Sequence, residues 1–246
     1  MTNEKKVALV TGANRGIGLE TARQLGQSNI TVVVAARSLK SATETADKLK
    51  AEGLDVFPVQ LDVTKPEDRS AAAKTISDKF GRLDILINNA GIGAEDGMFA
   101  AKTIETTDQE LQKLFGTNLF SVVAVTREFL PLLKKSSEGR IVNLSSILGS
   151  LTLHADPKSP IAGIKTFAYD ASKSALNAFT IHLADELKGT NIKVNSAHPG
   201  WVKTELGTEH APMEIVDGAK TSVQLALIGP DGPNGRFIHM GAELPW

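Results

Sequence analysis

The sequence contains no cysteine among its 246 residues. This absence excludes disulfides, thiolate nucleophiles and cysteine-based metal sites. Tyrosine is almost absent as well, because Tyr169 is the single one in the chain. A reaction that needs a phenol must therefore use that residue.

Basic clusters and long apolar runs are also missing. The formal net charge is −1 and no run of Lys or Arg stands out, which argues against nucleic acid as the main partner. No segment approaches the length of a membrane span. The apolar run Val7–Val10 near the start is too short for the core of a signal peptide. We therefore expect a soluble, cytoplasmic protein with no membrane partner.

Short apolar runs alternate with helical patterns along the chain. This alternation is typical of α/β proteins with a parallel sheet, and neither a linker nor an internal repeat interrupts it. The sequence thus predicts one domain, residues 1–246, with a doubly wound Rossmann-type parallel sheet of about seven strands and helices on both faces. The expected strands are Val7–Val10, Ile30–Ala36, Asp55–Leu61, Leu83–Ile87, Ile141–Leu144, Ile192–Ala197 and Gly235–Met240. The expected helices include Ala42–Ala51, one opened by Pro66, Asp108–Leu133 and Pro212–Ile228.

A glycine-rich turn, Thr11-Gly-Ala-Asn-Arg-Gly-Ile-Gly18, follows the first predicted strand. Glycines let the backbone turn tightly, and the N–H groups at the following helix start suit an anion such as a pyrophosphate. Glycine turns also occur for purely steric reasons. The spacing Gly12-x-x-x-Gly16-x-Gly18 differs from the G-x-G-x-x-G of many dehydrogenases. Dinucleotide binding is one of two interpretations at this point.

The ends of the second and third predicted strands bear on the choice of nucleotide. In a βαβ nucleotide unit, an acid after the second strand binds the ribose 2′-hydroxyl, whereas an arginine accommodates a 2′-phosphate. Arg37 stands there, and Arg15 adds a second cation, so NADP is favoured over NAD; the alternative is two solvated arginines. Asp62, after the third strand, can contact the adenine or cap the next turn.

Tyr169 and Lys173 are four residues apart within a helical apolar pattern that ends at Gly189. The spacing places the phenol and the ammonium on one helix face. A cation beside a phenol lowers the phenol pKa and makes it a better proton donor near neutral pH. Alone the pair is a weak signal, because a partly buried tyrosine with a solvated lysine one turn on is common.

Asparagines occupy two further informative positions. Asn88-Asn89 follow a predicted buried strand, where their side chains suit bonds that pin neighbouring loops. Asn118 lies inside a predicted helix, where asparagine is unfavourable, so a local contact is expected to require it.

These motifs, in this order, resemble the short-chain dehydrogenase/reductase family nearly end to end. The resemblance rests on the Thr11–Gly18 turn, Asp62, Asn88–Gly91, Asn118, Asn143–Ser146, Tyr169 with Lys173, and Pro199-Gly200. Within the family the chain looks most like the monomeric carbonyl reductase branch and its bacterial relatives. The supporting features are Asn14-Arg15 in the turn, an enlarged segment before Tyr169 and the Leu-Pro-Trp ending.

The resemblance implies an NADPH-dependent oxidoreductase that reversibly reduces ketone or aldehyde carbonyls to alcohols. Tyr169 would be the general acid, Lys173 would lower its pKa and bind the nicotinamide ribose, Ser146 would bind the substrate oxygen, and Asn118 would hold a relay water. Thr204 would meet the carboxamide end of NADP(H). The implied cofactor-binding residues are Gly12, Asn14, Arg15, Gly16, Ile17, Gly18, Arg37, Asp62, Val63, Asn89, Ala90, Gly91, Tyr169, Lys173, Pro199, Gly200, Val202 and Thr204.

Two other functions compete with this one. A non-catalytic NADP(H)-binding regulator can share the scaffold, because fold does not fix function, but it has no need of the proton relay. A methyltransferase with a related sheet would lack the tyrosine and lysine pair.

The five histidines show no paired spacing, so no metal site is expected. His154 and His210, in loops that border the expected substrate site, are predicted to be solvated. His182 and His198 are predicted to be structural.

The insert Leu151–Lys165 bears on assembly. Two prolines and little helical pattern predict a loop, packed by Leu151, Leu153, Ile161 and Ile164 against the helices beside it. Related proteins usually pair through two such helices, here near 108–133 and 166–188. An insert over that surface favours a monomer, with a homodimer as the alternative.

Overall fold

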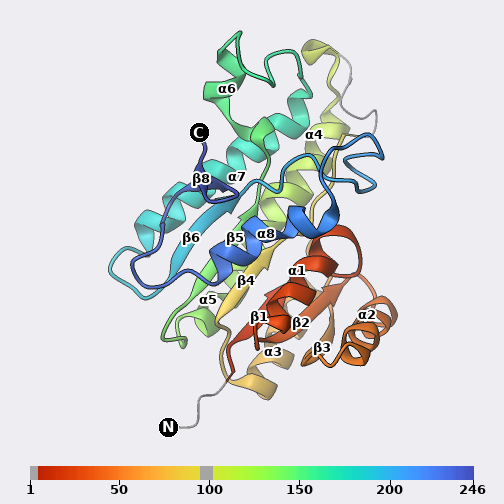
Figure 1. Cartoon of the computed structure of the whole chain (residues 1–246), viewed down its shortest axis with the longest axis vertical. Coiled ribbons are helices and arrows are strands. Elements are labelled where there is room, and N and C mark those ends of the chain that lie inside the picture. Colours follow the sequence, from red (N-terminus) through yellow and green to blue (C-terminus); the bar gives the residue numbers. More distant parts are fainter. Residues whose placement is uncertain (1–4, 95–101) are drawn as a thin grey trace.

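The computed structural model describes residues 5–94 and 102–246, and one twisted sheet runs through them (Figure 1). The strand order is β3-β2-β1-β4-β5-β6-β7-β8. All neighbouring strands are parallel except β7 and β8, which are antiparallel. The strands are β1 (Val7–Val10), β2 (Thr31–Ala36), β3 (Val56–Gln60), β4 (Ile85–Asn88), β5 (Arg140–Leu144), β6 (Lys193–Ala197), β7 (Phe237–His239) and β8 (Ala242–Glu243). The predicted sheet is confirmed, and the two-residue β8 adds one strand to the expected seven.

The sheet is buried on both faces, as parallel sheets usually are. Along β1, Ala8 and Val10 belong to one apolar cluster, and Val7 and Leu9 to another on the opposite face. This is the two-residue alternation of a strand. Because the side chains on both faces are buried, the strand sequences are continuous apolar runs and show no alternation of apolar and polar residues.

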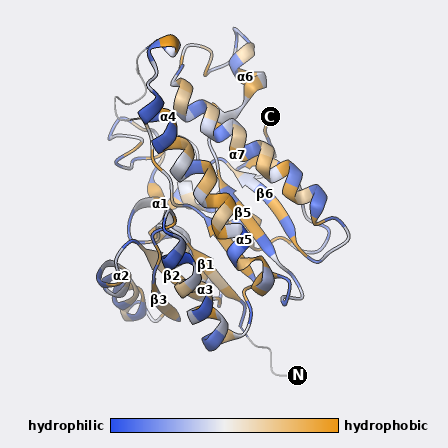
Figure 2. Cartoon of the chain, turned by 180° about the vertical axis from the view of Figure 1, so that it is seen from behind, coloured by the Kyte–Doolittle hydropathy of each residue, from blue (hydrophilic) through white to orange (hydrophobic). Residues whose placement is uncertain are grey.

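Helices cover the two faces in separate layers. The layer in front in Figure 1 holds α1 (Gly16–Gln27), α2 (Leu39–Ala51) and α8 (Ile215–Ala226); Leu25, Leu49 and Val223 pack into its core. The layer in front in Figure 2 holds α3 (Pro66–Phe80), α4 (Asp108–Phe115), α5 (Ser121–Leu133) and α7 (Phe167–Glu186). No helix among the described residues is both long and apolar enough to cross a membrane.

The predicted helix 108–133 is continuous but not regular. A π-helical turn, η3 (Gly116–Phe120), separates α4 from α5, and Asn118 lies in it. Such single turns often occur at functional sites. The predicted local need for Asn118 is confirmed. Its side-chain amide accepts a hydrogen bond from the Ile92 N–H and donates one to the Ile92 carbonyl.

The insert is not purely a loop, and that prediction was wrong in part. Residues Leu151–Ala155 form the short helix α6. The hydroxyl of Ser150 accepts a hydrogen bond from the Leu153 N–H, and the carbonyl of Trp246 accepts one from Thr152. Of the residues expected to pack the insert, Leu151 is largely exposed and Ile161 is buried.

A chain of buried polar side chains ties β4, β5, β6 and α7 together. Asn88 donates to the Oδ1 of Asn143 at 2.8 Å, and Asn143 donates to the hydroxyl of Thr180 at 2.9 Å. The Ser196 hydroxyl also bonds that of Thr180, at 2.9 Å. Removal of one member therefore takes one buried hydrogen bond from each of its neighbours in the chain.

Replacing Asn143 by Ala is expected to lower the free energy of unfolding by about 1–3 kcal/mol, since Asn88 and Thr180 each lose one buried hydrogen bond. Chemical denaturation measures the change. Asn191→Ala, which removes an exposed amide, is the matched control. Equal stability of the two variants would show that the buried chain adds nothing beyond a surface amide.

Candidate active site

The sheet places the predicted site residues along one edge. β1 lies between β2 and β4, so the strand order reverses there, and the carboxyl ends of the strands at such a point form a binding crevice. Residues 12–18 follow β1, Arg37 follows β2, Asp62 and Val63 follow β3, and residues 89–91 follow β4. Ser146 follows β5, and Pro199, Gly200, Val202 and Thr204 follow β6.

The glycine turn is fixed by its neighbour after β4. The side-chain amide of Asn89 donates to the carbonyls of Thr11 and Gly12, at 2.8 and 3.1 Å. Asn89 and Ala90 in turn donate their N–H groups to the Thr11 hydroxyl, both at 3.0 Å. The predicted pinning of a neighbouring loop is thereby confirmed for Asn89, whereas the Asn88 side chain bonds Thr126 of α5 and Asn143 of β5.

Two glycines in this turn are sterically required. Gly12 has a φ of +63°, and a Cβ there would lie 3.1 Å from the Ala90 Cα. A Cβ on Gly18 would collide with the Asn89 amide. No side-chain hydrogen bond caps the start of α1, and the uncapped N–H groups of a helix start suit an anion. These features fit a dinucleotide pyrophosphate.

The cations expected at the 2′-phosphate lie at the same end of the sheet. Arg37 is exposed. Arg15 hydrogen-bonds Glu205, at 2.5 Å, and both side chains are largely exposed.

Asp62 accepts two hydrogen bonds from Thr64, so it caps the turn, one of its two expected roles. Burial alone raises the pKa of Asp62, but those bonds and the nearby cations Lys65 and Arg37 outweigh it and lower the pKa.

The four residues expected to perform catalysis meet between η3, β5 and α7. Tyr169 and Ser146 line the same cavity, and the Ser146 hydroxyl is near enough to the phenol to lower its pKa. The Lys173 ammonium donates to the Leu144 carbonyl at 2.8 Å and lies 5.8 Å from the centre of the Tyr169 ring. Asn118 donates to the hydroxyl of Ser172 at 3.1 Å, which links it to α7 between the other two.

The Tyr169 pKa differs from the sequence prediction. Burial raises it to about 12, and the nearby Ser146 hydroxyl only partly opposes this effect. Lys173 is also buried, and burial lowers its pKa to about 8. Both groups therefore shift toward their neutral forms, because each loses hydration that its charged form needs. The expected lowering of the phenol pKa by Lys173 is absent in this structure.

A cavity of about 830 Å³ opens above Tyr169 and Ser146 and reaches Ile17 and Thr204 of the expected cofactor set. Its walls are mainly apolar. Sequence reasoning missed most of these wall residues, because no motif marks them: Ile147, Leu148, Trp201 and Leu206. Ile161 and Ile164 of the insert also line it, although they were expected to pack on the helices.

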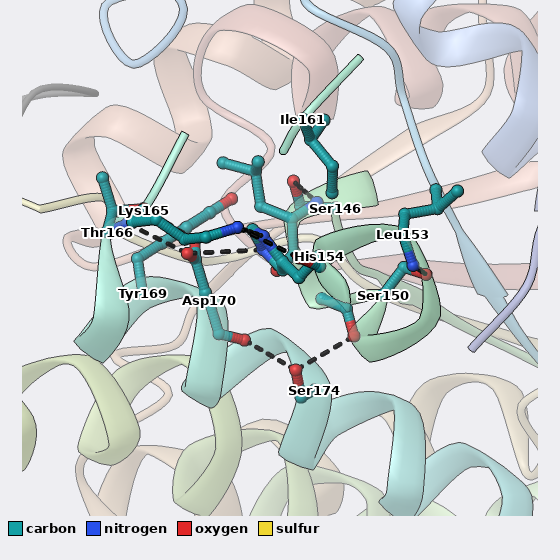
Figure 3. A network of polar contacts seen from close by, with 12 residues as sticks. Ser146, Ser150, Leu153, His154, Ile161, Lys165, Thr166, Tyr169, Asp170 and Ser174 are labelled. Carbon is teal, nitrogen blue, oxygen red and sulfur yellow. Dashed lines mark hydrogen bonds and ion pairs between the residues drawn. The ribbon is translucent and has the colours of Figure 1, made fainter. Parts of the chain in front are cut away.

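The histidines divide differently from the prediction. His154 is not solvated: its side chain is only 12% exposed and bonds the Leu148 carbonyl. It also contacts Lys165 and Asp170 (Figure 3). His198 is buried and accepts N–H groups from Ile147 and Gly200, which suits its predicted structural role. Next to His239, burial lowers its pKa to about 3. Within residues 5–94 and 102–246, no group of side chains is arranged to hold a metal ion.

Comparison with known proteins gives consistent matches. The family model described as short chain dehydrogenase matches residues 6–215. Carbonyl reductase (NADPH) 1 of Mus musculus is 32% identical over 286 aligned residues, with 100% of both chains covered. Salutaridine reductase of Papaver bracteatum is 34% identical over 292 residues, covering 94% of this chain and 93% of that one.

Among solved structures, the NADPH-bound carbonyl reductase from chicken fatty liver superposes with a TM-score of 0.86 at 29% identity, covering 99% of this chain and 100% of that one. The alignment with the mouse protein is longer than the present chain, so that relative carries segments that this chain lacks.

The burial of Lys173 predicts a pH dependence of stability. The pKa of Lys173 is about 8 in the folded protein, and its ordinary value is 10.5. At a pH between these two values, Lys173 binds a proton more fully in the unfolded chain than in the folded one, so the free energy of unfolding rises with pH. From about pH 7.5 to about 9.5 the expected rise is about 1–2 kcal/mol. The raised pKa of Tyr169 has the opposite effect only above about pH 10.

Chemical denaturation of the wild type, Lys173→Met and the exposed control Lys188→Met at both pH values measures this rise. The rise should vanish only in Lys173→Met. If it persists in that variant, another group is its source.

Proposed function

This chain belongs to the short-chain dehydrogenase family, and we propose that it reduces carbonyl compounds with Tyr169 as the general acid. It is an NADP-dependent oxidoreductase that carries out carbonyl reduction. One observation carries the proposal: Tyr169 and Ser146 line one cavity that also reaches Ile17, in the glycine turn, and Thr204. A carbonyl oxygen bound there meets two hydroxyl donors.

The chain's own residues divide the work as follows. The bound nicotinamide supplies a hydride to the carbonyl carbon. The Tyr169 hydroxyl gives its proton to the carbonyl oxygen, and the Ser146 hydroxyl orients that oxygen. Lys173 binds the nicotinamide ribose, and Asn118 holds the water through which Tyr169 regains its proton. The overall reaction consumes one carbonyl, one NADPH and one proton, and its reverse oxidises the alcohol.

The remaining cofactor contacts are proposed from position. The glycine turn, residues 12–18, holds the pyrophosphate, Arg37 and Arg15 hold the 2′-phosphate, and Asp62 and Val63 border the adenine. The residues after β4 and β6 border the nicotinamide half: Asn89, Ala90, Gly91, Pro199, Gly200, Val202 and Thr204.

The cavity walls favour ketones or aldehydes with apolar bulk. Ile147, Leu148, Ile161 and Trp201 supply hydrocarbon or aromatic surface, while the hydroxyl donors lie at Ser146 and Tyr169. Such a site binds a hydrophobic substrate by burial and orients it through its single carbonyl oxygen.

The cytoplasmic location and the monomeric state stay predictions. The insert lines the cavity through Ile161 and Ile164, so it serves the substrate site whether or not it also blocks pairing. Sedimentation at micromolar concentration decides the assembly state.

Tyr169→Phe is expected to reduce turnover of a ketone by at least about a hundredfold, because the proton donor is lost while the ring remains. NADPH absorbance follows turnover, and nucleotide fluorescence follows binding, which should change little. A variant that keeps most of its activity would remove the general-acid role. Wild-type protein that binds NADPH but reduces no carbonyl would favour the regulatory alternative.

Arg37→Asp is expected to weaken NADPH binding roughly tenfold to hundredfold, because a charge-assisted bond to the 2′-phosphate becomes a repulsion. NADH use should improve, since the carboxylate can accept from the ribose hydroxyl. Lys48→Asp, the same charge change at an exposed site on α2, is the control. Equal use of NADH and NADPH by the wild type would contradict the assignment.

A further inference from the structure

The insert forms a closed loop over the substrate cavity. His154 lies next to Ala155, the last residue of α6, and Lys165 lies two residues before Phe167, where α7 begins. The Lys165 ammonium lies 3.0 Å from the Nδ1 of His154 and 3.2 Å from its carbonyl oxygen. The two ends of residues 155–164 are therefore joined side to side. This closed segment contributes Pro160, Ile161 and Ile164 to the cavity wall.

The joined ends are attached to α7, beside Tyr169. Asp170 is buried, and its carboxylate accepts from the N–H and the hydroxyl of Thr166, at 2.9 and 2.6 Å. The Nε2 of His154 lies 3.4 Å from the same carboxylate (Figure 3). Burial raises the pKa of Asp170, although the Thr166 bonds, His154 and Lys165 oppose this effect.

His154 has a polar partner on each ring nitrogen. Nε2 lies 2.9 Å from the Leu148 carbonyl, which only accepts hydrogen bonds, and 3.4 Å from the Asp170 carboxylate. Nδ1 lies 3.0 Å from the Lys165 ammonium. One imidazole therefore bridges the cavity wall after β5, the end of the insert and the helix that carries Tyr169.

We propose that His154, seated on Asp170 and Lys165, is a positioning residue that holds the wall formed by residues 155–164 and thereby selects bulky apolar carbonyl substrates. This rests on the proposed carbonyl reduction at Tyr169. His154 acts through the wall: its ring bonds the Leu148 backbone, Lys165 and Asp170. A small carbonyl compound that does not reach Ile161 or Ile164 makes no contact with this wall, so its binding does not depend on His154.

The test compares acetone with acetylnaphthalene as substrates for the NADPH-loaded enzyme. His154→Ala should raise the KM for acetylnaphthalene roughly tenfold, because the wall loses the contacts of the imidazole with Leu148, Lys165 and Asp170. The kcat for acetone and the NADPH dissociation constant should change less than about twofold. His154→Gln should restore most of the KM, since its amide can donate to Leu148 and accept from Lys165. His182→Ala and His210→Ala remove exposed imidazoles and serve as controls.

Two outcomes would overturn the proposal. Equal losses for both ketones would make His154 a general structural residue, and a lower kcat with unchanged KM would make it part of the chemistry. If His154→Ala does not fold, Lys165→Met opens the other end of the loop and should raise the same KM.

Amide hydrogen exchange of residues 155–165, measured without substrate, separates this proposal from the proposed function. Exchange should quicken in His154→Ala and not in the two controls; unchanged exchange would refute the positioning role. If the wild type reduces no carbonyl at all, the proposed function fails, while the exchange result still decides whether His154 holds the wall.

Discussion

The close approach of α7 to the turn after β5 is the contact on which the site depends. That turn is η4 (Ile147–Gly149), and a Cβ on Gly149 would lie 2.9 Å from the Lys173 carbonyl carbon. Only glycine lets the two backbones come so close. The Gly149 carbonyl then accepts from Ser174 and Asn177, one and two turns below Tyr169 on the helix. With α7 fixed in this way, Tyr169 meets Ser146, and Lys173 reaches the end of β5.

The same contact buries the two ionisable groups of the site, with different consequences. A phenol with a pKa of about 12 keeps its proton throughout the neutral range, so it stays a donor until a more basic oxygen is present. In the proposed reaction, hydride transfer creates that oxygen. Lys173, with a pKa of about 8, remains mostly charged at neutral pH and is partly compensated by the Leu144 carbonyl. Burial therefore raises the pKa of Tyr169, whereas an adjacent cation alone would be expected to lower it.

Periodicity and strand-end motifs predicted the sheet, most helices and the place of the site, because these follow from local patterns and from the geometry of parallel strands. The predictions failed where distant residues decide. Helix α6 has too few residues for a periodic stripe, and one of its N–H partners is the carbonyl of Trp246. The partners of His154 come from residues 148, 165 and 170, which only the folded chain brings together. The direction of the Tyr169 shift likewise depends on tertiary burial, which an i,i+4 spacing does not encode.

The pairing of Arg15 with Glu205 shows how the two loops at the crevice can share one cation. The bond crosses from the glycine turn to the segment after β6, and the side chains are 62% and 74% exposed. An exposed ion pair contributes about 0–1 kcal/mol, because water screens it and both side chains lose freedom. A phosphate offers the guanidinium a forked, charge-assisted contact that is stronger than this pair. In the proposed binding mode, a 2′-phosphate would therefore displace Glu205 from Arg15. The Thr204 hydroxyl bonds Val202 and Gly207 within the same segment, and Val202 is buried, so the turn that carries Leu206 has contacts independent of the Arg15–Glu205 pair.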